Sequence, residues 1–349
     1  MAICLFAGGA TAFNVRRTVD NWGRMLEGTD ELHLVTCDPE AFGDVAGFET
    51  FGGGGGTGRR REVEVLRSYL RTHHPAVIAH VTQPPIHGTI VGALARRHGV
   101  PSIYRYAGDR FYQFRLHSGA KRVALYGLNN LVGRLPLHLS DRFVALGPHG
   151  RGRLVAYGAR PDRVCVLPPS VDPARFEGDR RADVDVPADR RVVLFLGRIS
   201  RLKGVGTIER TIDEVLARRP DLHFVFVGGE ERRPEVPPEY EDHLTFVGRV
   251  PPEEVPAYLR RADVLAHPSL TEGVPRAVLE ALFARTPVIA RDVGDTASVT
   301  GNTFRSDREF VELLCSFEDL PLDDPTPFSV DSLRPKYQTL FTYYTDRTS

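Results

Sequence analysis

Lysine is scarce in this sequence of 349 residues: Lys121, Lys203 and Lys336 are the only three among 45 basic residues. The acidic residues also number 45, so the chain has no net positive field that would hold the whole molecule on nucleic acid. We therefore expect no nucleic-acid partner. Because lysine is so rare, the position of each one is informative.

Cysteine is also sparse. Cys4, Cys37, Cys165 and Cys315 lie far apart and form no C-x-x-C pair, which argues against a zinc site and against a disulfide framework. Residues 1–9 lack both the basic region and the length of a signal or membrane-spanning segment. These features predict a cytoplasmic protein that, if it meets a membrane, lies on its cytoplasmic surface.

Short apolar runs alternate with longer amphipathic stretches almost from end to end, which is typical of parallel sheets with crossover helices. A polar segment at residues 177–190 interrupts the pattern before it restarts. The expected strands are residues 2–7, 31–36, 76–81, 102–106, 142–146 and 163–167 before the interruption, and 191–196, 223–227, 244–247, 264–267 and 288–291 after it.

The alternation predicts the α/β class, with two Rossmann-like, doubly wound domains that face each other across a cleft. Two domains also agree with the length, at roughly 150 residues per domain. We expect a first domain at residues 1–168, a linker at 169–190 and a second domain at 191–328. The helical spacing of apolar residues over 329–344 predicts a final helix, within residues 329–349, that crosses back onto the first domain.

Two basic residues follow the first expected strand of the second domain. Gly197 ends this strand, and Arg198 and Lys203 stand five positions apart before a helix. Open parallel sheets bind ligands at the carboxyl ends of their strands, and an arginine fork with a lysine charge near a helix N-terminus suits a diphosphate. Taken alone, the pair also fits a solvated basic loop.

A second segment carries two glutamates in an E-x7-E spacing. Glu272 lies in a loop before a helix expected to start at Pro275, and Glu280 lies within that helix. Gly273 would let the backbone approach a ligand, and the free amides of the helix start would point outward. Since a carboxylate accepts hydrogen bonds from two vicinal hydroxyls, the pair could hold a ribose and a hexose.

Two further strand ends carry glycine. Gly228 follows the strand at 223–227, and Gly248 precedes Arg249 and Val250, where main-chain groups could read a base edge. Each feature is weak by itself, because glycine after a strand is ordinary turn chemistry. Their order within one domain is much less common.

Together these motifs resemble the donor half of retaining glycosyltransferases of family 4, which have the GT-B fold. The resemblance rests on the G-R and K-G pairs at Arg198 and Lys203, on the spacing of Glu272 and Glu280, and on the later F-V-G, A-D-V and P-S segments. It extends over nearly the whole chain and is strongest from about residue 190 to 295.

The resemblance implies a retaining hexosyltransferase that requires neither a metal nor another cofactor, because the cationic pair stabilises the leaving nucleoside diphosphate. Its donor would be a UDP or GDP sugar, and its acceptor a glycan, a lipid-linked sugar or a small molecule. The implied donor site places the diphosphate on Arg198 and Lys203, the ribose on Glu280, the transferred sugar on Glu272, Gly273 and Val274, and further nucleotide contacts on Gly197, Gly228, Arg249 and Val250.

In the first half, Gly8 and Gly9 resemble the glycine-rich loop that faces the diphosphate in this family, although a plain tight turn has the same pattern. After the strand at 102–106 the family often has a histidine near the reacting sugar, whereas this chain has Asp109. Asp109 is either a catalytic substitute, acting with Arg198, Lys203 and Glu272, or a turn residue that caps the next helix.

Residues 110–142 are rich in aromatic and basic side chains. Such a stretch either lies on anionic lipid and recruits a lipid-linked acceptor, or forms a core-facing helix with solvated arginines. The glycine run 52–56 is likewise either a hinge over a site or a plain connector.

Some features depart from the family or point elsewhere. Arg285 stands where relatives commonly have glycine, which leaves the shape of that loop open. The D-x-D pattern at 183–185 has the form used by metal-dependent transferases, but it falls in the polar linker, so a surface position is the better interpretation. The alternatives to a transferase are a non-catalytic GT-B partner protein and a GT-B sugar-nucleotide epimerase.

Overall fold

The computed structural model describes residues 2–10, 13–53 and 58–346. The chain divides into two compact units, Met1–Ser170 with Phe328–Ser349, and Val171–Pro327, which we call unit 1 and unit 2. The residues expected as a linker pack on unit 2 from position 171 onward: Ala182 N–H donates to Ala257 O at 3.0 Å, and Arg260 donates to Arg180 O at 2.9 Å.

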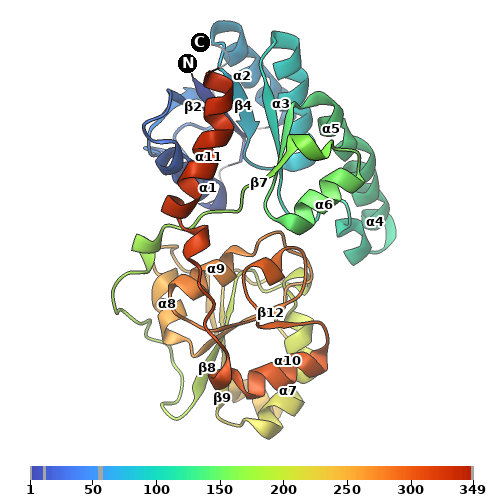
Figure 1. The fold of residues 1–349 in the computed structure, drawn as a ribbon. Helices are drawn as coiled ribbons and strands as arrows, with labels where there is room; N and C mark the ends of the chain where they lie inside the picture. Colours follow the sequence, from blue (N-terminus) through green and yellow to red (C-terminus); the bar gives the residue numbers. More distant parts are fainter. Residues whose placement is uncertain (1, 11–12, 54–57, 347–349) are drawn as a thin grey trace. The chain divides into compact units, whose positions relative to one another are not determined.

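Unit 1 is built on a parallel sheet that, within the described residues, has seven strands in the order β3-β2-β1-β4-β5-β6-β7 (Figure 1). Its strands are β1 Ile3–Gly8, β2 Leu32–Thr36, β3 Phe48–Gly52, β4 Val77–His80, β5 Ser102–Tyr106, β6 Arg142–Ala145 and β7 Val164–Val166. Its helices are α1 Phe13–Leu26, α2 Arg59–Thr72, α3 Pro84–His98, α4 Gly119–Tyr126, α5 Leu135–Leu139, α6 Pro148–Ala156 and α11 Val330–Thr345.

The core of unit 1 follows from the alternation of side chains along buried strands. In β1, Ile3 and Leu5 face the core shared with α1 and α11, whereas Cys4 and Phe6 face the core shared with α2 and α3. Both faces of the sheet are therefore covered, which explains why its strands are continuous apolar runs in the sequence.

The last helix, α11, packs on α1 within unit 1. Its apolar residues Leu333, Tyr337, Leu340, Phe341 and Tyr344 are all buried, and the rings of Tyr337 and Phe341 lie 5.3 and 5.7 Å from that of Trp22. The hydroxyl of Tyr337 donates to the carbonyl of Pro168 at 2.9 Å. This helix therefore completes the core of the first half of the chain.

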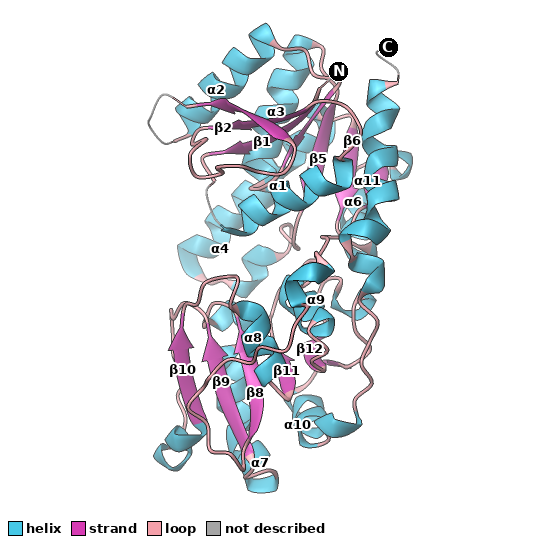
Figure 2. Cartoon of the chain, turned by 90° about the vertical axis from the view of Figure 1, so that its left-hand side faces the viewer, coloured by secondary structure: helices cyan, strands magenta, loops and turns pink. Residues whose placement is uncertain are grey.

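Unit 2 is a second parallel sheet, with six strands in the part of the chain that the structure describes, in the order β10-β9-β8-β11-β12-β13 (Figure 2). The core against α7 and α10 buries aromatic and β-branched residues of β8, β9 and β12. The strands are β8 Arg191–Leu196, β9 Leu222–Val227, β10 Leu244–Gly248, β11 Val264–His267, β12 Val288–Arg291 and β13 Thr303–Phe304, and the helices are α7 Val205–Arg218, α8 Val255–Arg261, α9 Arg276–Phe283 and α10 Asp307–Cys315.

The prediction of two doubly wound parallel sheets is confirmed, with two strands missed. Both missed strands, β3 and β13, lie at sheet edges, where burial is partial and the apolar signal is weak. Gly52 ends β3 at φ 131°, and a Cβ there would lie 1.8 Å from Thr36 O, so glycine is required by the neighbouring strand. Positions 54–56 of the glycine run lie outside the described residues, so the choice between hinge and connector stays open.

Of the two alternatives for residues 110–142, the core-facing helix is wrong for α4, because no residue of this helix is buried. None of the described helices is long and apolar enough to cross a membrane.

Candidate active site

The candidate donor residues lie in loops at the carboxyl edge of the unit 2 sheet, and these loops are bonded to one another. Gly197 N–H, after β8, donates to Val227 O at 2.8 Å, and Gly228 N–H, after β9, donates to Gly248 O at 2.7 Å. At Gly228, whose φ is 147°, a Cβ would lie 1.9 Å from Gly197 O. The exits of β8, β9 and β10 therefore form one packed backbone layer in which Gly228 has no space for a side chain.

The loop after β8 is fixed in the same way to the loop after β11. Leu270 N–H donates to Leu202 O at 2.9 Å. Gly204 has φ 83°, and a Cβ there would lie 1.8 Å from Pro268 O. Lys203, which directly precedes Gly204, is thereby held beside the residues that follow β11.

Lys203, Glu272 and His267 meet in this place. Glu272 Oε1 accepts from Lys203 Nζ at 2.6 Å and lies 3.1 Å from His267 Nε2. The Glu272 side chain is 14% exposed and that of Lys203 is 32% exposed. A cation and a carboxylate that lie 69 positions apart in the sequence thus form one cluster, and His267, the last residue of β11, shares it.

The pKa of Glu272 lies below its ordinary value. Burial alone would raise this pKa, but the hydrogen bond and charge of His267 and the charge and hydrogen bond of Lys203 outweigh burial. Glu272 is therefore an ionised carboxylate that only accepts hydrogen bonds. It is suited to bind hydroxyl groups, and its negative charge keeps Lys203 in place.

The segment from Gly273 to Glu280 is held by the loop after β12. Asp295 N–H donates to Gly273 O at 2.9 Å, and a Cβ at Gly294 would lie 2.2 Å from Glu272 O. Helix α9 begins at Arg276, with Pro275 as the residue just before it rather than in its first turn. Glu280 is buried within α9, and Val274 is also buried.

Arg198 has a different ion-pair partner from Lys203. Its guanidinium forms an ion pair with Glu231 at 3.0 Å, and both side chains are exposed. Arg249, after β10, approaches the exit of β9, because a Cβ on Gly229 would lie 2.6 Å from its Nε. Of the two cations expected at the diphosphate, Lys203 is therefore paired with Glu272, and Arg198 is paired with Glu231.

Arg285 has a left-handed backbone conformation, which glycine adopts more readily than arginine. It follows α9 with φ 62°, in the left-handed region that ordinary residues rarely adopt. Arginine in place of the expected glycine therefore adds backbone strain at position 285, but the loop still forms the turn.

In unit 1, the Gly8–Gly9 turn rests on three polar side chains that the sequence did not single out. Gly9 N–H donates to Glu62 Oε1 at 3.2 Å, and the same oxygen lies 3.2 Å from His87 Nε2. Arg59 donates to the other oxygen of Glu62 at 2.7 Å. Glu62 and His87 are buried, so the turn after β1 lies on an internal ion-paired support rather than on solvent.

Burial would raise the pKa of Glu62, but hydrogen bonds from Arg59 and Gly9 and the neighbouring His87 lower it overall. The pKa of His87 is lowered by burial, against the opposing effect of Glu62. A charged carboxylate and a neutral imidazole are the forms that follow. In the sequence Glu62 directly follows three arginines, and nothing in that context indicates that it is buried.

Asp109, after β5, accepts hydrogen bonds from side chains on two other elements. Its Oδ2 lies 3.1 Å from His149 Nε2 and 3.4 Å from an Arg153 nitrogen, both on α6, and its Oδ1 accepts from the Tyr106 hydroxyl at 3.4 Å. Both oxygens are therefore used in side-chain contacts, which differs from the helix-capping alternative. No histidine follows β5 in the sequence, but His149, 40 positions after Asp109, lies beside it in the structure.

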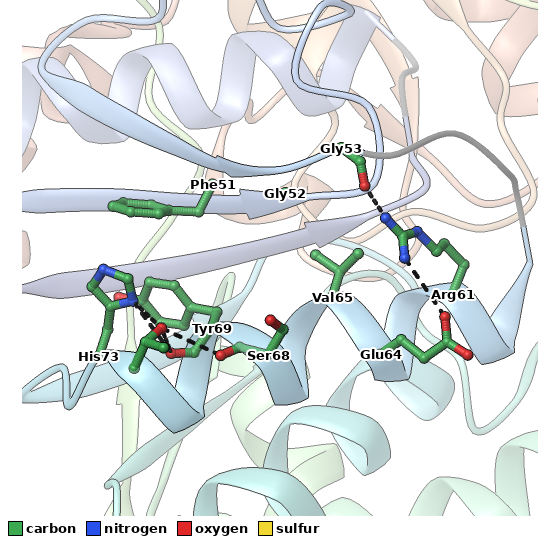
Figure 3. A pocket seen from close by; sticks show the side chains of 10 residues that line it. Phe51, Gly52, Gly53, Arg61, Glu64, Val65, Ser68, Tyr69 and His73 are labelled. Carbon is green, nitrogen blue, oxygen red and sulfur yellow. Dashed lines mark hydrogen bonds and ion pairs between the residues drawn. The ribbon is translucent and has the colours of Figure 1, made fainter.

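A shallow pocket of about 250 Å³ lies between β3 and α2 (Figure 3). Its wall includes Phe51, Tyr69 and His73, and the rings of Tyr69 and His73 stack at 4.8 Å. Arg61 donates to Gly53 O and lies 3.6 Å from Glu64. These side chains bond mainly to one another, and the pocket shares no residue with the clusters described above.

Comparison with known proteins assigns the family. Residues 15–175 match the family described as Glycosyltransferase Family 4, and residues 190–316 match the family described as Glycosyl transferases group 1. The chain belongs to the family 4 glycosyltransferases. The resemblance that the donor motifs carry is thus confirmed at the level of the family.

Curated relatives match over part of their length. The chain is 36% identical over 172 residues to a D-inositol 3-phosphate glycosyltransferase of Nocardia farcinica, which covers 44% of the chain and 38% of the relative. It is 35% identical over 142 residues to the putative teichuronic acid biosynthesis glycosyltransferase TuaC of Bacillus subtilis, covering 39% and 35%. The chain thus spans less than half the length of these relatives.

Solved structures show the fold. Anabaena Alr3699/HepE in complex with UDP-glucose superposes with a TM-score of 0.64 at 14% identity, over 99% of the chain and 95% of that protein. Sucrose-phosphate synthase from Thermosynechococcus elongatus superposes with a TM-score of 0.72 at 18% identity, over 98% and 95%. The chain has the GT-B fold, as the motifs led us to expect.

Proposed function

We propose that this protein transfers a sugar from a nucleotide diphosphate sugar to an acceptor. The observation that carries the proposal is the cluster of Lys203, Glu272 and His267 at the carboxyl edge of the unit 2 sheet. It places an ammonium group and an ionised carboxylate where open α/β sheets bind their ligands. A diphosphate requires the first group and sugar hydroxyls require the second.

In the proposed reaction Lys203 exchanges partners when the donor binds. The ammonium group turns from Glu272 to the diphosphate, and Glu272 accepts hydrogen bonds from the transferred sugar, aided by the amides of Gly273 and Val274. Arg198 would add a second cation to the diphosphate after leaving its exposed pair with Glu231. Because these cations stabilise the leaving nucleoside diphosphate, the step requires no metal ion.

Retention of the anomeric configuration belongs to the same proposal. The sugar would be attacked from the side that the diphosphate leaves, with a donor phosphate oxygen helping to accept the proton. No side-chain nucleophile is then needed. Glu280, buried in α9, would accept from the ribose hydroxyls, and main-chain groups near Gly228, Arg249 and Val250 would contact the nucleotide.

Unit 1 would supply the acceptor side. Asp109 and His149 together offer an acidic and a basic group 3.1 Å apart, enough to orient an acceptor hydroxyl or the transferred sugar. The named relatives act in different pathways, so the acceptor class stays a glycan, a lipid-linked sugar or a small molecule.

The first experiment is a thermal-shift screen with UDP, GDP and ADP and their sugars, followed by a transfer assay with the donor that stabilises the protein. UDP-glucose is a natural starting point, since the complex named for HepE contains it. We expect stabilisation by one nucleotide, product with retained configuration, and unchanged activity in EDTA. Release of an epimerised sugar nucleotide without transfer would favour the epimerase alternative.

Two variants test the site itself. Lys203→Ala and Glu280→Ala should abolish transfer while the protein stays folded. Lys336→Ala is the matched control, because Lys336 is exposed on α11 and lies outside the candidate site. Near-normal transfer by Lys203→Ala or Glu280→Ala would refute the assignment, and nucleotide binding without any transfer would favour the non-catalytic partner.

A further inference from the structure

An apolar surface is exposed on unit 1 over residues 119–135, which we call the α4 surface. It comprises α4, the π-helical turn Gly127–Leu131, the 3-10 turn Val132–Arg134 and the start of α5. Helix α4 stands at the periphery of unit 1 (Figure 1). Of the seven large apolar side chains that are exposed within the described residues, this segment contributes five: Val123, Tyr126, Leu131, Val132 and Leu135.

The α4 surface has polar groups inside and apolar groups outside. Asn129 and Asn130 are buried, whereas the next residue, Leu131, is 65% exposed. Asn130 donates to Phe111 O at 3.0 Å and accepts from the Tyr157 hydroxyl at 2.9 Å. These bonds hold the turn in its orientation, so its leucine side chains cannot turn inward without breaking buried hydrogen bonds.

Clustered apolar exposure on a folded protein marks a surface that something else covers. Single exposed leucines are ordinary, but most of the exposed large apolar side chains described here fall within one 17-residue segment. Val123, in the middle of α4, is 71% exposed. The α4 surface therefore has the character of a docking site.

The charge of the segment indicates what docks there. Residues 110–140 contain no aspartate or glutamate, while Lys121, Arg122 and Arg134 are exposed on the α4 surface itself. A second copy of the chain would bring the same positive groups against each other in a two-fold dimer, which is unfavourable. Basic side chains beside exposed leucine, valine and tyrosine match the anionic headgroups and acyl chains of a bilayer.

We propose that the α4 surface docks on an anionic lipid bilayer. Val123, Leu131 and Leu135 enter the boundary between headgroups and acyl chains, and Lys121 and Arg122 contact the lipid phosphates. The proposal concerns where the protein works and holds whether or not the proposed sugar transfer is correct.

The test is co-sedimentation of the full chain with vesicles of phosphatidylcholine, with and without phosphatidylglycerol. We expect binding only when phosphatidylglycerol is present, and weaker binding as salt is added. Each basic side chain near such a surface strengthens binding about fivefold. Lys121→Gln/Arg122→Gln should therefore weaken binding about 30-fold, whereas Arg67→Gln/Arg71→Gln, on exposed positions of α2, should leave it unchanged.

A second pair of variants tests the apolar contribution. Leu131→Asp should abolish vesicle binding, while Leu322→Asp, at an exposed large apolar side chain of unit 2, should not. Since both side chains are exposed, both variants should keep the melting temperature of the natural protein. Equal loss in the matched controls, or no binding of the natural protein to anionic vesicles, would overturn the proposal. So would a natural protein that dimerises without binding vesicles and becomes monomeric in Leu131→Asp.

Discussion

The ion pair between Lys203 and Glu272 gives the sharpest quantitative test of the candidate site. Exposed pairs contribute about 0.2–1 kcal/mol, and breaking a fully buried pair costs about 3–5 kcal/mol. This pair has a separation of 2.6 Å, with 32% and 14% of its side chains exposed, so it lies between these limits. We expect a coupling free energy of about 2 kcal/mol in a double-mutant cycle of Lys203→Met and Glu272→Gln.

Urea unfolding followed by circular dichroism provides the free energies for this cycle. Trp22 is the single tryptophan and lies in unit 1, so its fluorescence reports separately on the unit that carries neither mutation. The matched pair is Arg198 with Glu231, whose side chains are 65% and 55% exposed. Its cycle should give less than about 1 kcal/mol. Equal coupling free energies in the two cycles would contradict the argument that partial burial strengthens the Lys203–Glu272 pair.

The same pair predicts a pH dependence. Because the pKa of Glu272 is lower in the folded protein, the unfolded chain binds more protons in acid, and folding stability falls as the pH falls. The stability difference between the natural protein and Glu272→Gln should be largest above about pH 5. It should shrink below the ordinary glutamate pKa of about 4.3. A difference that grows in acid would contradict an ionised, stabilised Glu272.

Three further predictions concern single residues. Gly8→Ala should destabilise unit 1 by about 3 kcal/mol by Trp22 fluorescence, because Gly8 has φ 59° and a Cβ would lie 2.7 Å from buried His87; Gly99→Ala, at φ 70° with open space around it, should cost only about 1 kcal/mol. Arg285→Gly should stabilise unit 2 by up to about 1 kcal/mol in urea unfolding, since it relieves a left-handed arginine but adds freedom to the unfolded chain; a loss of stability would mean that the arginine side chain makes a compensating contact. Asp109→Asn should lower kcat by about 100-fold in the transfer assay with little change in nucleotide affinity; unchanged kcat would restrict Asp109 to a structural role.

Most of the fold could be predicted because parallel strands that are buried on both faces have nearly continuous apolar sequences. The strand over 191–196, in which five of six residues are apolar, agrees with its predicted bounds for this reason. Two of the edge strands carry a weaker signal: β3 mixes partly buried with exposed residues, and β13 has only two residues. The other two edge strands, β7 and β10, were predicted. The sequence left the environment of α4 open, because a stretch rich in aromatic and basic residues fits either a core-facing or an exposed helix.

The candidate site could be predicted only where its residues follow strands. Arg198, Lys203 and Glu272 stand at strand exits, so sheet topology alone places them at one edge. Their partners cannot be predicted in that way. His267 is the buried last residue of β11, and His149 contacts Asp109 from helix α6. Both contacts therefore depend on packing.

The glycines at these strand exits also have different reasons for being there. Cβ atoms at Gly204, Gly228 and Gly294 would lie 1.8, 1.9 and 2.2 Å from backbone oxygens of neighbouring loops, whereas one at Gly197 would meet nothing within 4 Å. The first group is therefore required by the mutual packing of the loops, independent of any ligand. Gly197, with φ 132°, has open space beside it at the exit of β8. Gly248, with φ 82°, likewise has no atom within 4 Å of a built Cβ, so at both positions the left-handed backbone itself is what favours glycine.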